Sequence, residues 1–357
     1  MELLRMISML MVTTLHALGK TDLLEAFGNS LSVNGWIAWT LEALSICAVN
    51  VFMLISGYFL IESRFQWKRL AEIVFQTVFY SAGVFAVFWL TGNLQSDEKD
   101  LYHALHGVLP IHMNLYWFIT AYVGLYLLLP MITAGVKALS EKQLRIMIIT
   151  LLTYECLFKS LLPVVLEEDS KGYSTFWFLI VFLVGAYFRL YGFHYLTKAV
   201  RGLIVYLLSC ALMLAEAFAL GMIHEKTGHG KEILEISFHY NHLFVLLAAV
   251  GIFALFLHAR SIQGVAARVI CMISPYALGV YLLQENLTLR YRWQDWFGLN
   301  GALKLPTLSF VGKIFVAVML MFVFGICVDF LRSLLFRGVA FVGGSFAKKP
   351  SASGEKR

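Results

Sequence analysis

Two basic side chains interrupt an otherwise apolar N-terminal stretch, Met1 to Leu18. Arg5 and His16 lie about three helical turns apart, or roughly 16 Å of rise, so both fall on nearly the same face of a helix. A charged side chain in a membrane span is costly and usually faces a protein interior or a wet cavity. The stretch therefore predicts a buried face with a fixed cation near one end and a titratable base near the other. This arrangement suits a donor held by its anionic part, with the reaction centre some distance away.

Glu42 is the third candidate for chemistry, because it lies in the next apolar run at a depth comparable to that of His16. Histidine is the usual general base near neutral pH, and a carboxylate beside it would hold its tautomer and stabilise the imidazolium. We therefore predict that Arg5, His16 and Glu42 are catalytic, if the first two helices are neighbours. Each also has a structural alternative: an arginine reaching the membrane surface, a core histidine and a structural ion-pair partner, respectively.

The composition indicates what must position these residues. The chain has 357 residues, of which 60% are hydrophobic and 14% charged, whereas soluble domains have about a quarter charged residues. Many apolar runs approach the length of about 20 residues that crosses a bilayer. The sequence predicts an all-α, polytopic helix bundle in the cell membrane, with the lipid bilayer as its surroundings.

We expect about ten transmembrane helices. They are placed near residues 1–20, 36–61, 71–92, 115–136, 144–166, 174–191, 202–223, 241–258, 270–288 and 309–336. Basic residues concentrate in alternate loops, and the positive-inside rule then puts both termini in the cytoplasm. Residues 1–342 form the predicted transmembrane domain, and the small, polar residues 343–357 are predicted to be a disordered cytoplasmic tail.

Several other function classes lack support. The net charge of +6 comes from loop residues, so it indicates membrane orientation and no nucleic-acid partner. No P-loop, GxGxxG or GxSxG motif occurs. The five cysteines lie in apolar stretches without ligand spacing, and no metal site is predicted. Tyr116 and Trp117 are aromatic residues at a membrane edge, which serve either as interface anchors or as a sugar-stacking surface.

Four stretches resemble one known family. ELLRMISMLMVTTLH, with arginine, ten residues and then histidine, is similar to the opening of the integral-membrane acyltransferase 3 family. The later stretches VNVFMLISGYFL (49–60), YWFITAYVGLYLLLPMI (116–132) and SPYALGVYLLQEN (274–286) resemble further family segments. The similarity extends over nearly the whole chain.

The resemblance implies an enzyme that moves an acyl group, typically acetyl, from cytoplasmic acyl-CoA to hydroxyls of cell-surface glycans or lipid-linked sugars. It makes His16 the catalytic histidine and Arg5 the supporting arginine. Asn50, Ser56 and Gly57 fall on the second-helix motif. The family often has an aspartate where Asn50 stands, so we assign Asn50 no acid-base role and predict that it binds substrate, together with Tyr116 and Trp117.

We therefore expect acetyl-CoA to enter from the cytoplasm and its phosphates to be neutralised by cations. The residues predicted to bind it are Arg5, Ser56, Gly57, Arg64, Lys68 and Arg69. His16 either takes the proton of the acceptor hydroxyl or first accepts the acyl group itself. The alternative is a transporter or flippase that uses Arg5, Glu42 and His16 as a proton or substrate relay.

Overall fold

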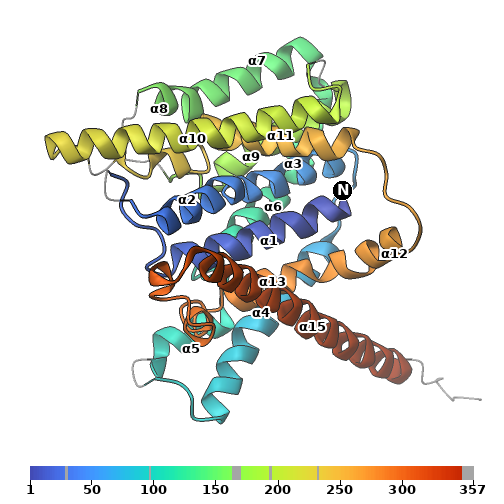
Figure 1. Cartoon of the computed structure of the whole chain (residues 1–357). Coiled ribbons are helices and arrows are strands. Elements are labelled where there is room, and N and C mark those ends of the chain that lie inside the picture. The colour runs from blue at the N-terminus through green and yellow to red at the C-terminus, as the bar shows by residue number, and fades with distance from the viewer. Residues whose placement is uncertain (29–30, 96–97, 163–169, 193–194, 231–232, 348–357) are drawn as a thin grey trace, which may run out of the picture.

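A computed structural model describes residues 1–28, 31–95, 98–162, 170–192, 195–230 and 233–347. Within these ranges the chain is helical and contains no β-strand (Figure 1). The longer helices are α1 (Glu2–Gly19), α2 (Val33–Ser45), α3 (Ala48–Leu60), α4 (Trp67–Leu90), α6 (Trp117–Ala138), α7 (Glu141–Leu152), α9 (Thr175–Tyr191), α10 (Ala199–Thr227), α11 (Leu243–His258), α12 (Gly264–Ile273) and α15 (Thr307–Ala347). The shorter ones are α5 (Leu101–Val108), α8 (Phe158–Leu161), α13 (Ala277–Gln284) and α14 (Trp293–Trp296).

Seven segments of the described chain are long and apolar enough to cross a membrane. They are Val33–Leu60, Trp67–Leu90, Trp117–Ala138, Ala199–Thr227, Ile236–His258, Gly264–Gln284 and Thr307–Gly338. Their number and the helical content confirm the predicted all-α, polytopic membrane bundle. Each of the seven corresponds to one of the predicted spans.

Three of the ten predicted spans are not among these segments. The span at 1–20 is α1, which carries Glu2, Arg5 and His16. The span at 144–166 is divided into α7, a π-helix (Thr153–Leu157) and α8, and its last residues lie outside the described ranges. The span at 174–191 is α9, an apolar helix of 17 residues. The total of ten spans and the cytoplasmic location of the termini therefore stay predictions.

The last helix is longer than the sequence predicts. α15 continues to Ala347, so residues 343–347 of the predicted tail are helical. The remainder of that tail, 348–357, lies outside the described residues. α15 crosses the other helices obliquely, and it ends on the side of the bundle where α1 begins (Figure 1).

The predicted span at 36–61 is two helices. α2 and α3 are separated by a turn at Ile46 and Cys47. α3 then packs closely against α9, because a Cβ atom at Gly57 would overlap the carbonyl oxygen of Phe182. Gly185 on α9 meets the backbone of Leu54 on α3 in the same way. Two glycines thus allow the backbones of α3 and α9 to touch.

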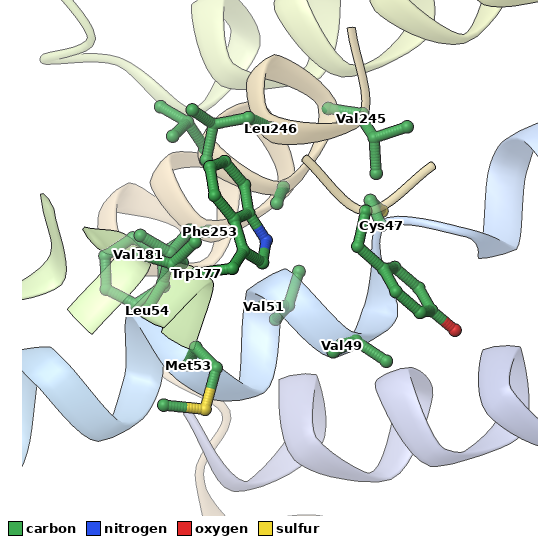
Figure 2. Packing of buried hydrophobic residues seen from close by; sticks show 14 of the residues in the cluster. Cys47, Val49, Val51, Met53, Leu54, Trp177, Val181, Val245, Leu246 and Phe253 are labelled. Atoms are coloured by element: carbon green, nitrogen blue, oxygen red, sulfur yellow. The ribbon is translucent and has the colours of Figure 1, made fainter. Parts of the chain in front are cut away.

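Two apolar clusters form the interior. The first joins α3, α9 and α11, with Trp177 and Phe253 completely buried between the helices (Figure 2). The second joins α1, α13 and α15. On its edge, the buried carboxylate of Asp329 accepts hydrogen bonds from Tyr80 at 3.0 Å and from Arg332 at 2.6 Å. The bond from Tyr80 fixes α15 against α4 beside the second cluster, whereas the bond from Arg332 lies within α15.

Candidate active site

A cavity of about 250 Å³ lies between the two apolar clusters. Side chains of α1, α3, α4, α6 and α13 line it. Both Arg5 and His16 are among the lining residues. The face predicted from their spacing on the first helix is therefore a cavity wall, with the arginine and the histidine at different levels of one cavity.

Arg5 is held at its level by one neighbour on its own helix and one on α3. Its guanidinium forms an ion pair with Glu2 and lies 5.6 Å from the ring centroid of Phe59 on α3. Glu2 also accepts a hydrogen bond from the hydroxyl of Ser274, which lines the cavity just before α13. The cation is thus already positioned, and an incoming anion needs only to compete with one partly exposed carboxylate.

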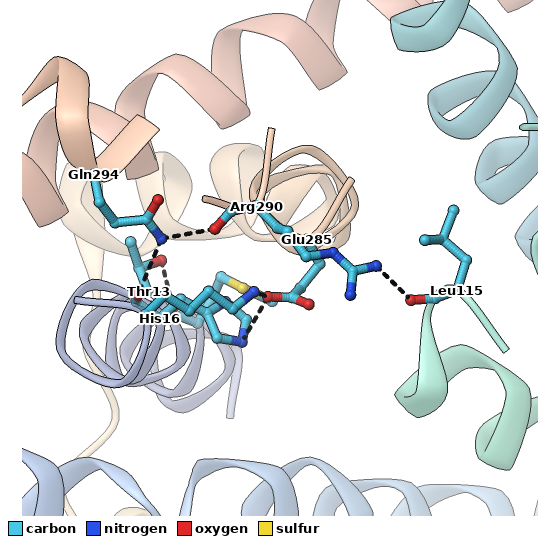
Figure 3. A network of polar contacts seen from close by, with 8 residues as sticks. Thr13, His16, Leu115, Glu285, Arg290 and Gln294 are labelled. Carbon is cyan, nitrogen blue, oxygen red and sulfur yellow. Dashed lines mark hydrogen bonds and ion pairs between the residues drawn. The ribbon is translucent and has the colours of Figure 1, made fainter. Parts of the chain in front are cut away.

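The histidine has an acidic partner that comes from the far end of the sequence. His16 Nε2 lies 3.3 Å from Oε1 of Glu285, at the end of α13 (Figure 3). Lys20, one turn beyond His16, forms an ion pair with the same carboxylate oxygen. Because the side chain of Glu285 is only 8% exposed, its negative charge is stabilised mainly by these two residues and little by solvent.

The contact with Glu285 assigns different roles to the two imidazole nitrogens. A carboxylate oxygen accepts hydrogen bonds, so Nε2 carries the proton when the ring is neutral. The lone pair then lies on Nδ1, which is buried and has no hydrogen-bond partner among the described residues. Nδ1 of His16 is consequently the nitrogen that can act as an acceptor, toward a ligand or toward the buried amide of Gln284 beside the ring.

Backbone contacts fix the position of this histidine. Gln294 on α14 is fully buried, and its Nε2 donates to the carbonyl oxygen of His16 at 3.0 Å and to that of Arg290 at 2.9 Å (Figure 3). The guanidinium of Arg290 donates in turn to the carbonyl oxygen of Leu115 at 3.4 Å. The segment after α13 therefore connects the end of α1 with the start of α6.

Glu42 does not have its predicted place beside His16. The structure gives no hydrogen bond or ion pair between them, and Glu285 has the contact expected of Glu42. Glu42 is buried on α2, and its Oε2 atom has no hydrogen-bond partner among the described residues. The contact was expected from the depths of the two residues along their helices, and depth does not determine how α2 is rotated about its axis.

The residues predicted to bind the donor divide into three groups. Ser56 lines the cavity. Gly57 does not, because it faces α9 and permits the close approach of the two helices. Arg64, Lys68 and Arg69 are exposed, Arg64 just before α4 and the two others in its first turn.

Among the predicted acceptor-binding residues, only Trp117 lines the cavity. Tyr116 is completely buried, and its hydroxyl donates to the carbonyl oxygen of Leu282 at 3.0 Å.

Asn50 is buried as well. Its amide donates to the carbonyl oxygen of Tyr240 and accepts from the indole of Trp177, at 2.8 and 2.9 Å. Asn50 therefore positions Tyr240, which lines the cavity, and has no contact with the cavity of its own.

The described residues contain no group of three or more histidine, cysteine, aspartate or glutamate side chains arranged to hold a metal ion. The free cysteines Cys47, Cys156 and Cys210 are buried, whereas Cys271 and Cys327 are exposed.

The fold is that of a multi-pass membrane protein. One wall of its cavity carries Arg5, a cation, and His16, which can act as a general base. The acyltransferase domain of the acyltransferase 3 family matches residues 1–328. The chain therefore belongs to that family and is a membrane acyltransferase. The sequence matches no curated protein and no solved structure. Family membership favours the enzymatic prediction over the transporter alternative.

Proposed function

We propose that this membrane acyltransferase transfers an acetyl group from cytoplasmic acetyl-CoA to a hydroxyl of a cell-surface glycan or a lipid-linked sugar. One observation supports this proposal most directly. Arg5 and His16 line a single cavity, and His16 is held by Glu285 with its Nδ1 unoccupied. An anion-binding group and a general base are thus available to one ligand.

The donor binds with its phosphates toward Arg5. Arginine pairs with phosphate through two parallel hydrogen bonds, and the exposed cations at the start of α4 add a favourable field. Arg5 and His16 are separated by about three helical turns, or roughly 16 Å. An extended arm that ends in a thioester fits this separation, with its reactive carbonyl near His16.

The acceptor approaches the other side of that carbonyl. Trp117 lines the cavity, and its ring lies 4.3 Å from that of Tyr173 and 5.5 Å from that of Tyr240. Aromatic faces of this kind offer an apolar surface with polar edges, on which the C–H face of a sugar ring can stack. Trp117 therefore remains our acceptor-binding residue, with Tyr240 in place of Tyr116.

His16 acts as the general base in a direct transfer. Nδ1 removes the proton of the acceptor hydroxyl as its oxygen attacks the thioester carbonyl carbon. The carbon–sulfur bond then breaks, and the imidazolium returns the proton to the thiolate of CoA. Glu285 stabilises the intermediate imidazolium through its contact with Nε2. The products are an ester on the acceptor and free CoA.

Mass spectrometry of surface glycans tests the function as a whole. Glycans from cells that produce the protein are compared with those from cells that lack it and from cells with the His16→Ala variant. We expect a mass increment of one acetyl group on a single sugar, only with the unaltered protein. Identical glycans in all three samples would contradict the proposed acceptor class.

A further inference from the structure

Tyr281 carries a hydroxyl proton that no group of the protein accepts among the described residues. It belongs to α13, is 5% exposed and lines the same cavity as His16. The centroids of the Tyr281 and His16 rings are 6.3 Å apart. No group among the described residues accepts a hydrogen bond from the buried Tyr281 hydroxyl. Because an unpaired buried donor is unfavourable, this hydroxyl is suited to a ligand that brings an acceptor.

The first turn of α6 faces the same space. Trp117, Phe118 and Ile119 all line the cavity. The first backbone N–H groups of a helix have no partner within it and carry a partial positive charge. Tyr116, the residue that precedes the helix, provides no side-chain cap, since its hydroxyl is bonded to the carbonyl oxygen of Leu282.

These two features converge. The backbone amide of Phe118 faces the Tyr281 oxygen, and the Phe118 and Tyr281 rings have centroids 5.9 Å apart. A ligand atom that accepts a hydrogen bond from Tyr281 therefore also lies near the positive end of α6. The Phe118 amide thus supports the Tyr281 hydroxyl, because an N–H group directed at the phenol oxygen makes that hydroxyl a stronger hydrogen-bond donor to a negatively charged oxygen beside His16.

We propose that Tyr281 and the first turn of α6 form an oxyanion site, in which the Tyr281 hydroxyl is a catalytic group. The inference rests on the proposed function. When the acceptor oxygen attacks, the π electrons of the thioester carbonyl move onto its oxygen. Tyr281 donates a hydrogen bond to that oxyanion and keeps its own proton. The electrons then return to re-form the carbonyl as the thiolate leaves with the proton carried by His16.

Such a donor acts on the acyl group, whichever nucleophile attacks. This separates it from a residue that only positions the acceptor. Removing an oxyanion donor slows transfer to the acceptor and slow hydrolysis by water to the same extent. Removing an acceptor-binding group slows transfer and leaves hydrolysis unchanged.

The test is a kinetic comparison of the purified full chain with its Tyr281→Phe variant, using acetyl-CoA as donor. CoA release is measured without acceptor, and with a glycan acceptor once one is available. Loss of one oxyanion donor typically lowers kcat by about 100- to 1,000-fold. We expect kcat for CoA release to fall by about 100-fold, with the KM for acetyl-CoA and the thermal stability little changed.

Tyr206→Phe is the matched control, because Tyr206 is a buried tyrosine whose hydroxyl donates to the carbonyl oxygen of Leu44 outside the cavity. We expect its kcat per folded protein to stay at the unaltered value. A Tyr281→Phe variant whose kcat falls by less than about tenfold, or whose loss comes through KM or unfolding alone, would overturn the oxyanion site. If the unaltered protein releases no CoA from acetyl-CoA, it is the proposed function that fails.

Discussion

Glu285 lies against His16, with its Oε1 atom 3.3 Å from the imidazole Nε2. The two residues come from opposite ends of the chain and meet where α1 and α13 both end (Figure 3). Lys20 shares the same carboxylate oxygen. Glu285 therefore sets the tautomer of the imidazole and leaves the lone pair on Nδ1.

The first prediction separates the two carboxylates that could act on the histidine. Glu285→Gln keeps the shape of the side chain and removes the negative charge that stabilises the imidazolium. We expect kcat for acetyl transfer to fall by about 100-fold or more. Steady-state kinetics of purified protein, with circular dichroism to confirm folding, measure this loss.

Glu42→Gln is the contrasting variant, because it makes the same chemical change in a buried carboxylate without a contact to His16. We expect its kcat for CoA release to stay within a few-fold of the unaltered value. Equal losses in both variants would show that Glu285 has no special relation to the histidine.

The second prediction concerns the cation at the other level of the cavity. Arg5→Met removes a charge-assisted contact with donor phosphate, which is worth about 1.5–3 kcal/mol. The KM for acetyl-CoA should therefore rise by about 10- to 100-fold. Because Arg5 lies away from the reacting carbonyl, kcat should change much less.

The control for Arg5 is Arg260→Met, since Arg260 is exposed between α11 and α12 and does not line the cavity. Its KM for acetyl-CoA should equal that of the unaltered protein. A lower kcat at unchanged KM in Arg5→Met would assign Arg5 to the chemical step and contradict a donor-binding role.

The third prediction tests why glycine stands at position 57. In Gly57→Ala the new methyl group overlaps the backbone of Phe182, so α3 and α9 must move apart. We expect a destabilisation of about 1–3 kcal/mol, seen as a lower melting temperature in detergent.

Gly135→Ala on α6 provides the comparison, because no atom lies near the position of its added methyl group. This variant should melt at or slightly above the temperature of the unaltered protein, since alanine favours the helix. If Gly57→Ala melts like Gly135→Ala, then close packing of α3 and α9 does not account for Gly57.

The sequence was sufficient for features that depend on local geometry. Helical periodicity places Arg5 and His16 on one face, and the structure confirms that they share a cavity. The pair of Asp329 and Arg332, one turn apart on α15, was predictable for the same reason.

Features that depend on how each helix is rotated and which helices pair could not be predicted from the sequence. Glu285 is separated from His16 by most of the chain, although it stands in the segment 274–286 that resembles the family. Ser56 and Gly57 are neighbours in the Ser-Gly motif, yet Ser56 lines the cavity and Gly57 packs against α9. Only the packing of α3 shows which of the two neighbours faces a ligand.

The most direct measurement is CoA release from acetyl-CoA by purified protein in detergent, where no ion gradient exists, compared between the unaltered chain and His16→Ala. We expect steady CoA release by the unaltered protein and loss of nearly all of it in the folded variant. Full activity in His16→Ala would contradict the central role of this histidine.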